Sequence, residues 1–197
     1  MKKYLIILEG IATSGKTTII KNLEKILSSS HLVRIFTEQE TLMTIIDNHQ
    51  FEVAHKHLNG LLMEFKKTPS DIIITDRYHF THAFRTEKNL DSIHELEQTL
   101  FKDFNAHIFL LTIRENKILE RVQDARNRRK EWLGKSGILE EKTKYYTKQQ
   151  KKMRELANQS KIPVTQIDTT NMNWIEITSK IIKEMKLNNP TREVLAD

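Results

Sequence analysis

Short apolar runs of strand length recur along the chain, and each is followed by a stretch in which apolar residues recur every three or four positions. The first pattern favours buried β-strands, and the second favours amphipathic helices. The predicted strands are Tyr4–Leu8, Leu32–Phe36, Asp71–Thr75, His107–Ile113 and Ile162–Ile167. The predicted helices are Lys16–Ser29, Phe51–Lys67, Ser92–Phe104, Glu115–Lys130, Glu140–Ser160 and Trp174–Lys186.

This alternation of strands and helices predicts the fold class. Continuous apolar strands are typical of parallel sheets covered on both faces, and crossovers between parallel strands are right-handed. We therefore expect an α/β fold, a doubly wound, five-stranded parallel sheet with helices on both faces. No internal repeat or linker rich in proline and glycine divides the chain, so residues 1–197 are expected to form a single domain. Residues 187–197 are expected to be a loosely ordered tail.

Composition narrows the class of protein. The chain is 38% hydrophobic and 29% charged, as is usual for globular proteins. Its first apolar run is short and meets Glu9 and Gly10, which indicates a buried strand and not a signal peptide. The sequence has no apolar stretch long enough to span a membrane and no cysteine for a disulfide or a thiolate metal site. We expect no membrane association and a cytoplasmic location.

A phosphate-binding loop follows the first strand. Residues Gly10 to Thr17 read Gly-Ile-Ala-Thr-Ser-Gly-Lys-Thr and match the Walker A pattern Gly-x-x-x-x-Gly-Lys-[Ser/Thr] at every fixed position. The strand before it and the helix after it are the context that this mechanism requires, because backbone N–H groups at the helix N-terminus hold the phosphates. The residues expected to bind the nucleotide are Gly10, Thr13, Ser14, Gly15, Lys16, Thr17 and Thr18.

The pattern also predicts the cofactors. Lys16 is expected to reach the β- and γ-phosphates of ATP, and the hydroxyl of Thr17 is expected to coordinate Mg²⁺. The loop alone does not distinguish a kinase from a GTPase, an ATPase or a nucleic-acid motor. Residues elsewhere in the chain must make that distinction.

Charged side chains follow two further predicted strands. Asp76 and Arg77 come after Ile72–Thr75, and Glu38 follows Phe36, so all three belong to the carboxyl edge of the sheet, where α/β folds bind ligands. An aspartate there holds the magnesium shell or orients an acceptor hydroxyl, and an arginine grips a phosphate. Glu38 and Asp76 are both candidates for the general base of a hydroxyl acceptor, whereas a phosphate acceptor mainly needs positioning. The alternative is an ordinary solvated surface.

A basic segment lies further along the chain, with 14 Lys or Arg against 6 Asp or Glu between Arg114 and Arg154, while the net charge of the whole chain is +6. Arginines 126, 128 and 129 precede a stretch with two glycines. We interpret residues 121–139 as a lid whose Arg126 and Arg129 neutralise charge in the transition state. A solvated helix face is the alternative, and nucleic acid is an unlikely partner because the segment reads as helical with few interleaved aromatic residues.

One helix carries a candidate for binding the acceptor. Phe51, Ala54, Leu58, Leu62 and Phe65 share a helix face and are expected to pack mostly in the core. Phe51, the first of them, is also a candidate for stacking on a base, with His55 one turn later as a polar contact. Tyr78, directly after Arg77, is a further candidate. The histidines at 49, 55, 57, 79 and 82 show no spacing of a metal site.

The order of these motifs resembles the thymidylate kinase family, and the related deoxynucleoside kinases are similar. The resemblance covers nearly the whole chain and depends on Leu8-Glu9-Gly10, Ser14-Gly15-Lys16-Thr17-Thr18, Asp76-Arg77-Tyr78, Leu119-Glu120-Arg121, Met153-Arg154-Glu155-Leu156-Ala157 and Ile167-Asp168.

The resemblance implies a P-loop NTPase fold with a helical lid and, as is usual in that family, a possible homodimer. It also implies that Lys16 contacts the ATP phosphates, that Asp76 and Arg77 act near the acceptor phosphate, and that Phe51 stacks on the base. The sequence departs from the family pattern in four places: Ala12 replaces an aspartate, Thr37 and Gln39 replace the arginine and proline flanking the glutamate, the following Gly-Gly is missing, and His55 replaces an arginine.

We therefore expect ATP- and Mg²⁺-dependent phosphoryl transfer to a small-molecule acceptor, with a nucleoside monophosphate favoured. A deoxynucleoside or another hydroxyl compound is the alternative acceptor. The alternative of another class is a nucleotide-binding regulator or ATPase that contacts nucleic acid. The sequence lacks an Asn-Lys-x-Asp motif, which argues against a GTPase.

Overall fold

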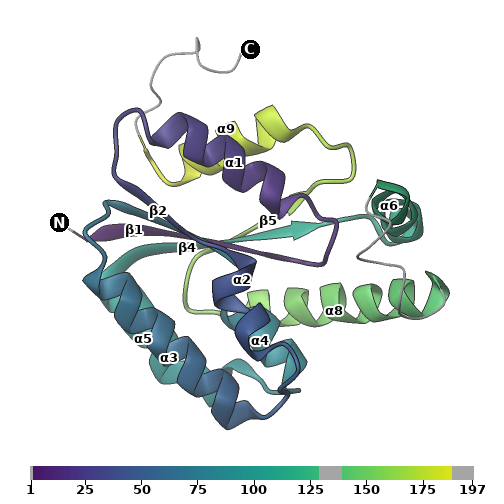
Figure 1. The fold of residues 1–197 in the computed structure, drawn as a ribbon, viewed down its shortest axis with the longest axis horizontal. Coiled ribbons are helices and arrows are strands. Elements are labelled where there is room, and N and C mark those ends of the chain that lie inside the picture. The colour runs from purple at the N-terminus through teal and green to yellow at the C-terminus, as the bar shows by residue number, and fades with distance from the viewer. Residues whose placement is uncertain (1, 129–138, 188–197) are drawn as a thin grey trace.

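The computed structural model describes residues 2–128 and 139–187 of the chain. Its sheet contains β1 (Lys3–Gly10), β2 (Val33–Phe36), β3 (Ile72–Asp76), β4 (Phe104–Thr112) and β5 (Val164–Asp168). The strand order is β2-β3-β1-β4-β5, and every neighbouring pair is parallel. The predicted five-stranded parallel sheet is confirmed (Figure 1).

The central strand β1 sets the two faces of the core. Leu5 and Ile7 pack into one hydrophobic cluster, and Ile6 and Leu8 pack into another, because successive side chains of a strand point to opposite faces. All four side chains are fully buried. The sheet is therefore covered on both sides, as the unbroken apolar strands predict.

The helices form one layer on each face. Figure 1 shows α1 (Lys16–Leu27) and α9 (Trp174–Glu184) together on one face of the sheet. The layer on the other face contains α3 (Phe51–Lys67), α4 (His79–Arg85), α5 (His94–Asp103) and α8 (Leu139–Gln159). Helix α6 (Glu115–Arg128) lies beyond the end of β4, so it adjoins the carboxyl edge of the sheet (Figure 1).

Two short helices at that edge were not predicted. Helix α2 (Glu38–Thr41) begins with a capping box, in which the backbone N–H of Thr37 donates to Glu40 at 2.9 Å. Helix α4 follows Tyr78 without an apolar repeat, and its residues are all buried. The structure also has 3₁₀ turns at Met43–Ile45 and Leu90–Ile93, and the latter shortens the predicted helix Ser92–Phe104 to His94–Asp103.

Two sequence predictions fall largely outside the described residues. The described part of the predicted lid, 121–139, is the end of α6 and the first residue of α8, and residues 129–138 lie outside. Residues 188–197 of the predicted tail also lie outside. None of the helices in the described ranges is long and apolar enough to cross a membrane.

Candidate active site

The phosphate-binding loop connects β1 to α1, and its backbone explains its glycines. Gly10 and Gly15 have φ angles of 144° and 93°, which side chains strongly disfavour. A Cβ atom at Gly10 would lie 2.5 Å from the carbonyl oxygen of Leu111, and one at Gly15 would overlap the ring of Trp174. Thr13 also has a positive φ, 72°. The loop therefore curls tightly at the N-terminus of α1, as phosphate binding requires.

Lys16 is the first residue of α1 and its side chain is buried under the loop. Its Nζ donates to the carbonyl oxygens of Gly10 and Ile11, at 3.1 Å each. The pKa of Lys16 is lowered to about 8, mainly by burial and also by the nearby charge of Arg77, while Asp76 acts in the opposite direction. The ammonium group is thus held inside the loop, next to an arginine and an aspartate.

A cavity of about 520 Å³ opens beside the loop, a size within the usual range for a small-molecule site. It brings together residues from the phosphate-binding loop, α1, α2, the turn at Met43, the end of β3, α6, and the start of α9 with the segment before it. The lining residues are Ala12, Thr13, Gly15, Lys16, Thr17, Thr18, Glu38, Gln39, Met43, Arg77, Arg121, Ala125, Met172 and Trp174.

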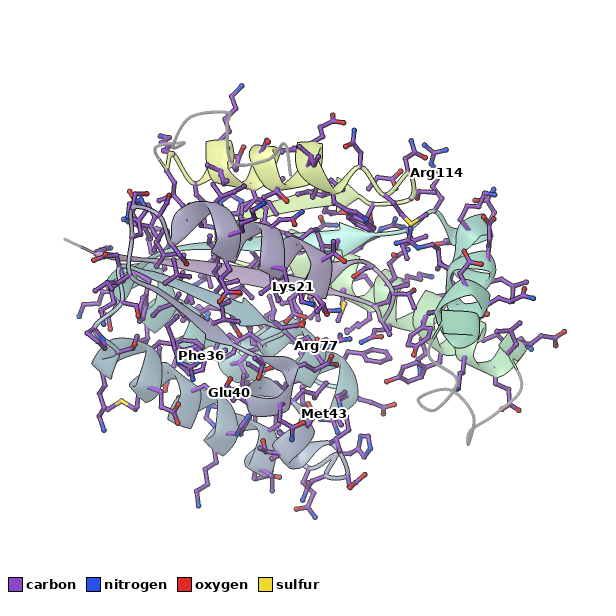
Figure 2. The ribbon with its side chains drawn as sticks, turned by 45° about the horizontal axis from the view of Figure 1, so that its top comes forward. Lys21, Phe36, Glu40, Met43, Arg77 and Arg114 are labelled. Carbon is purple, nitrogen blue, oxygen red and sulfur yellow. The ribbon has the colours of Figure 1, made fainter. Side chains whose placement is uncertain are left out.

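Hydrogen bonds hold Arg77 between Glu38 of α2 and the phosphate-binding loop. Its Nε donates to Glu38 Oε1 at 2.8 Å, and its Nη1 donates to the carbonyl oxygen of Gly10 at 2.8 Å. Burial disfavours the charged guanidinium, but Glu38 and Asp76 outweigh that effect and raise the pKa of Arg77. Figure 2 shows Arg77 between the helix that carries Lys21 and the segment that carries Glu40 and Met43. The predicted meeting of Glu38 with Arg77 at one edge is observed.

Asp76 ends β3 beside Arg77 and is 4% exposed. Burial raises the pKa of its carboxyl, against the charges of Lys16 and Arg77. Its Oδ1 is buried and has no hydrogen-bond partner in the described protein. A buried carboxylate oxygen without a partner is costly unless a ligand or ion satisfies it, so Asp76 is suited to the role predicted for it.

Glu9, near the end of β1, supports this arrangement, and no separate role was predicted for it. It is fully buried and accepts hydrogen bonds from the backbone N–H groups of Tyr78 and Phe80 and from the hydroxyl of Thr81, at 2.9, 3.0 and 2.6 Å. These bonds fix the segment that directly follows Asp76 and Arg77. An acidic residue at the end of an otherwise apolar strand is the signal that identifies it.

Arg121 and Trp174 line the cavity next to the phosphate-binding loop and were not predicted as nucleotide- or substrate-binding residues. Arg121 Nη2 donates to the carbonyl oxygen of Thr13 at 2.9 Å, and its guanidinium lies 5.6 Å from the centre of the Trp174 ring. Arg121 belongs to the Leu-Glu-Arg motif noted above, but no local pattern marks Trp174. A flat aromatic ring beside a guanidinium is a surface that suits a nucleobase.

The structure separates the predicted acceptor residues. Phe51 is half-buried, packs against the core cluster and stacks on His55, with ring centres 5.4 Å apart. Asn59 donates to the His55 ring at 3.2 Å. Tyr78, in contrast, is fully buried, and its hydroxyl donates to the carbonyl oxygen of Leu58 at 2.9 Å. We therefore remove Tyr78 from the acceptor-binding residues, because the core already uses both its ring and its hydroxyl.

The side chains of Arg126 and Arg129, the two arginines predicted to act in the lid, lie outside the described part of the chain. Arg126 lies in α6, but its side chain falls outside the described part of the chain, and Arg129 lies outside it entirely. Their role stays a prediction. Two tyrosines of α8 feel the charge of Arg77: burial raises the pKa of Tyr145 and of Tyr146, and Arg77 acts to lower both.

Comparison with known proteins was made at the level of sequence and of structure. No protein-family model and no curated protein matches the sequence. The YorR protein of Bacillus subtilis, solved in complex with phosphorylated GDP, is 18% identical with a TM-score of 0.62, over 92% of this chain and 95% of that one. Polyphosphate kinase 2 of Arthrobacter aurescens TC1 is 15% identical with a TM-score of 0.65, over 98% and 72%.

A third similar structure is the thymidylate kinase of Candida albicans, 16% identical with a TM-score of 0.58, over 94% of this chain and 92% of that one. At this level of identity the likeness shows the fold. The chain shares the α/β fold of these three structures, with a loop that matches the Walker A pattern after its first strand.

Proposed function

We propose that the protein transfers the terminal phosphoryl group of ATP to a small-molecule acceptor, with a nucleoside monophosphate as the favoured acceptor. The observation that carries the proposal is the convergence of Lys16, Arg77 and Glu38 on one cavity, with Asp76 directly beside it. A loop for the donor phosphates and an arginine beside it that can bind the acceptor phosphate support phosphoryl transfer by positioning and charge neutralisation.

The donor side consists of the phosphate-binding loop. Its backbone N–H groups and Lys16 would hold the β- and γ-phosphates, and Arg121 with Trp174 would accommodate the base. Thr17 and Asp76 fit a magnesium site, because Asp76 Oδ1 is a buried oxygen without a partner. Among the described residues no three His, Asp or Glu side chains cluster into a metal site, as suits an ion that retains waters and phosphate ligands. When bound, Mg²⁺ neutralises charge on the phosphates.

The acceptor side favours a phosphate over a hydroxyl. Glu38 is already engaged with Arg77 at 2.8 Å, so the carboxylate positions the guanidinium and is less suited to remove a proton. Arg77 would orient the acceptor phosphate. An oxygen of that phosphate attacks the γ-phosphorus, the bond from the γ-phosphorus to the bridging oxygen breaks, and ADP and a diphosphate leave. The acceptor needs no general base, because its phosphate is already a nucleophile.

Identification of the product tests this proposal. Purified protein would be incubated with Mg·ATP and, separately, with nucleoside monophosphates, nucleosides and other hydroxyl compounds, followed by chromatography of the products. We expect a nucleoside diphosphate from one class of monophosphate. Phosphorylation of a nucleoside alone would support the hydroxyl-kinase alternative. ATP binding without transfer to any acceptor would contradict the proposal and favour a regulator or ATPase.

A further inference from the structure

The backbone of Arg77 has a conformation that a residue with a side chain rarely adopts. Its φ angle is 70°, in the left-handed region. Because side chains disfavour this region, the surrounding contacts must hold the residue there. The guanidinium reaches Glu38 and the carbonyl oxygen of Gly10 from this backbone, so the left-handed turn sets where its donors lie.

Hydrogen bonds fix both peptide groups that flank Arg77. On one side, its N–H donates to the carbonyl oxygen of Leu8 at 2.9 Å. On the other side, its carbonyl oxygen accepts from the hydroxyl of Thr75 at 2.8 Å, and the N–H of Tyr78 donates to Glu9 at 2.9 Å. Because φ and ψ of a residue relate the planes of its two peptide groups, these three bonds together determine the left-handed turn.

Glu9 accepts more hydrogen bonds than any other residue of this set. Its Oε1 accepts from the N–H groups of Tyr78, Phe80 and Thr81, at 2.9, 3.0 and 3.2 Å, and its Oε2 accepts from the Thr81 hydroxyl at 2.6 Å. The side chain is fully buried, so water does not compete for these donors. Helix α4 has no cap from the side chain of its own first flanking residue, Tyr78. Glu9 therefore caps this helix from the neighbouring strand β1.

The buried charge of Glu9 offers another explanation for its presence. Against the effect of burial, Glu9 acts to raise the pKa of Lys16 and of Arg77. Its effect on each is smaller than that of Asp76 or of Glu38. The hydrogen bonds to the turn, in contrast, come from Glu9 alone among these acidic residues. The bonds are thus the more specific contribution of Glu9.

We propose that Glu9 is a positioning residue for phosphoryl transfer. Its hydrogen bonds hold Arg77 in the left-handed turn and so keep the guanidinium at Glu38 and Gly10, where the acceptor phosphate would meet it. This role depends on the length and the accepting oxygen of the side chain and not on its charge. The inference rests on the proposed function, because Arg77 is the residue that would bind the acceptor.

Three replacements of Glu9 separate length from charge. Glu9→Gln keeps the length: its Oε1 can accept from the three N–H groups, and its Nε2 can donate to the Thr81 hydroxyl. Glu9→Asp keeps the charge but is one methylene shorter, so its oxygens end about 1.5 Å short of these donors. Glu9→Ala has neither property. Tyr78→Phe is the matched control, because it removes a buried hydrogen bond beside the turn and leaves the bonds of Glu9 intact.

Steady-state kinetics with the acceptor and ATP varied in turn measures the effect. In Glu9→Asp and Glu9→Ala, kcat/KM for the acceptor should fall about 10- to 100-fold, as expected when a group that orients a substrate is displaced by about 1 Å. In Glu9→Gln and Tyr78→Phe it should stay within about threefold of the wild type, and the KM of ATP should change by less than about threefold in all four variants.

Combination with Arg77→Lys tests whether Glu9 acts through Arg77. The double variant of Glu9→Asp and Arg77→Lys should lose little more activity than Arg77→Lys alone, whereas a general loss of stability would add to the effect. Thr75→Val provides a second route if Glu9→Asp does not fold. It frees the carbonyl oxygen of Arg77 from the other side of the turn and should give the same loss on the acceptor side.

Crystal structures of Glu9→Asp and Glu9→Gln test the geometry without turnover. Arg77 should leave its left-handed conformation in the first variant and keep it in the second. Three results would overturn the inference: wild-type kcat/KM in Glu9→Asp, a loss in Glu9→Gln as large as that in Glu9→Ala, or an unchanged Arg77 in Glu9→Asp. If Arg77 moves in Glu9→Asp but the wild type transfers no phosphate, the proposed function fails and the placement of Arg77 by Glu9 stands. The two claims therefore fail separately.

Discussion

Arg77 donates from Nη1 to the carbonyl oxygen of Gly10 at 2.8 Å, so the arginine expected to bind the acceptor is bonded directly to the first residue of the phosphate-binding loop. The contact follows from the sheet, because β1 and β3 are neighbours and Leu8 pairs with Asp76. Donor and acceptor phosphates would then meet at a distance set by the backbone of two adjacent strands. Holding the two reacting groups at a fixed distance lowers the activation barrier of the transfer.

Replacement of Arg77 by lysine should impair the acceptor side selectively. Lysine keeps the charge but cannot hold Glu38 and Gly10 through two separate nitrogens. We expect kcat/KM for the acceptor to fall about 100-fold, which corresponds to roughly 3 kcal/mol of lost charged hydrogen bonding, with little change in ATP affinity. Steady-state kinetics with each substrate varied in turn measures this. Equal losses on the ATP side would contradict the assignment.

Replacement of Gly15 by alanine tests the geometry of the phosphate-binding loop, and replacement of Gly60, outside the loop, is its control. Gly15 has a φ of 93° and its Cβ would overlap Trp174, whereas Gly60 is an exposed residue within α3 with nothing within 4 Å of an added Cβ. Gly15→Ala should destabilise the protein by about 1–3 kcal/mol and weaken ATP binding. Gly60→Ala should stabilise it by about 0.5–1 kcal/mol and leave ATP binding unchanged. Urea unfolding and nucleotide titration give both quantities, and an unstrained Gly15→Ala would refute the loop geometry.

Tyr78→Phe tests whether Tyr78 belongs to the core. The variant keeps the ring and removes only the hydroxyl that donates to Leu58, leaving a buried carbonyl without that donor. The free energy of unfolding should fall by about 1–2 kcal/mol. The KM of the acceptor should stay the same, since the hydroxyl faces α3 and not the cavity. A raised acceptor KM at unchanged stability would restore Tyr78 to the substrate-binding residues.

His82 should make the fold sensitive to acid. Its Nε2 lies 2.8 Å from the carbonyl oxygen of Thr41, in the helix that carries Glu38. The pKa of His82 is lowered to about 4, mainly by burial, although the contact with Thr41 acts to raise it. The charges of His57, Arg85 and His79 contribute to this lowering.

Because the folded pKa of His82 lies below the unfolded value of about 6.5, its contribution to stability is complete above pH ~6.5 and is lost as the pH falls towards 4. In the wild type, the unfolding free energy should decrease by on the order of 1–3 kcal/mol across this window. His82→Gln retains a donor for Thr41 without titrating, so its stability should depend less on pH. Equal slopes for the two proteins in urea unfolding at pH 7 and pH 4.5 would exclude this role.

Much of the fold followed from local pattern. Apolar runs such as Ile72–Ile74 have no alternation, so burial on both faces and a parallel sheet were predictable from them. The placing of Glu38 near Arg77 followed from the rule that parallel strands end at one edge. The Thr-x-x-Glu pattern from Thr37 to Glu40 is a local signal for the start of α2.

The remainder of the site depends on contacts between distant segments, for which no local pattern exists. Trp174 reaches the loop only because α9 packs beside α1, and it then occupies the space above Gly15. Tyr78 precedes α4 and Arg85 ends it, and all residues of this helix are buried, so an apolar repeat could not mark its faces. The burial of Tyr78 was missed for the same reason, since its polar neighbours in the sequence hid a core position.

The most direct test of the central claim is the rate of phosphoryl transfer from ATP to the best monophosphate acceptor in the wild type, Lys16→Ala and Lys21→Ala. Lys16 is buried under the loop, whereas Lys21 is an exposed lysine of the same helix (Figure 2). Loss of one charged donor to the transferred phosphate should reduce kcat by about 100-fold or more in Lys16→Ala and leave Lys21→Ala at the wild-type rate. Equal rates in all three folded proteins would contradict phosphoryl transfer at this loop.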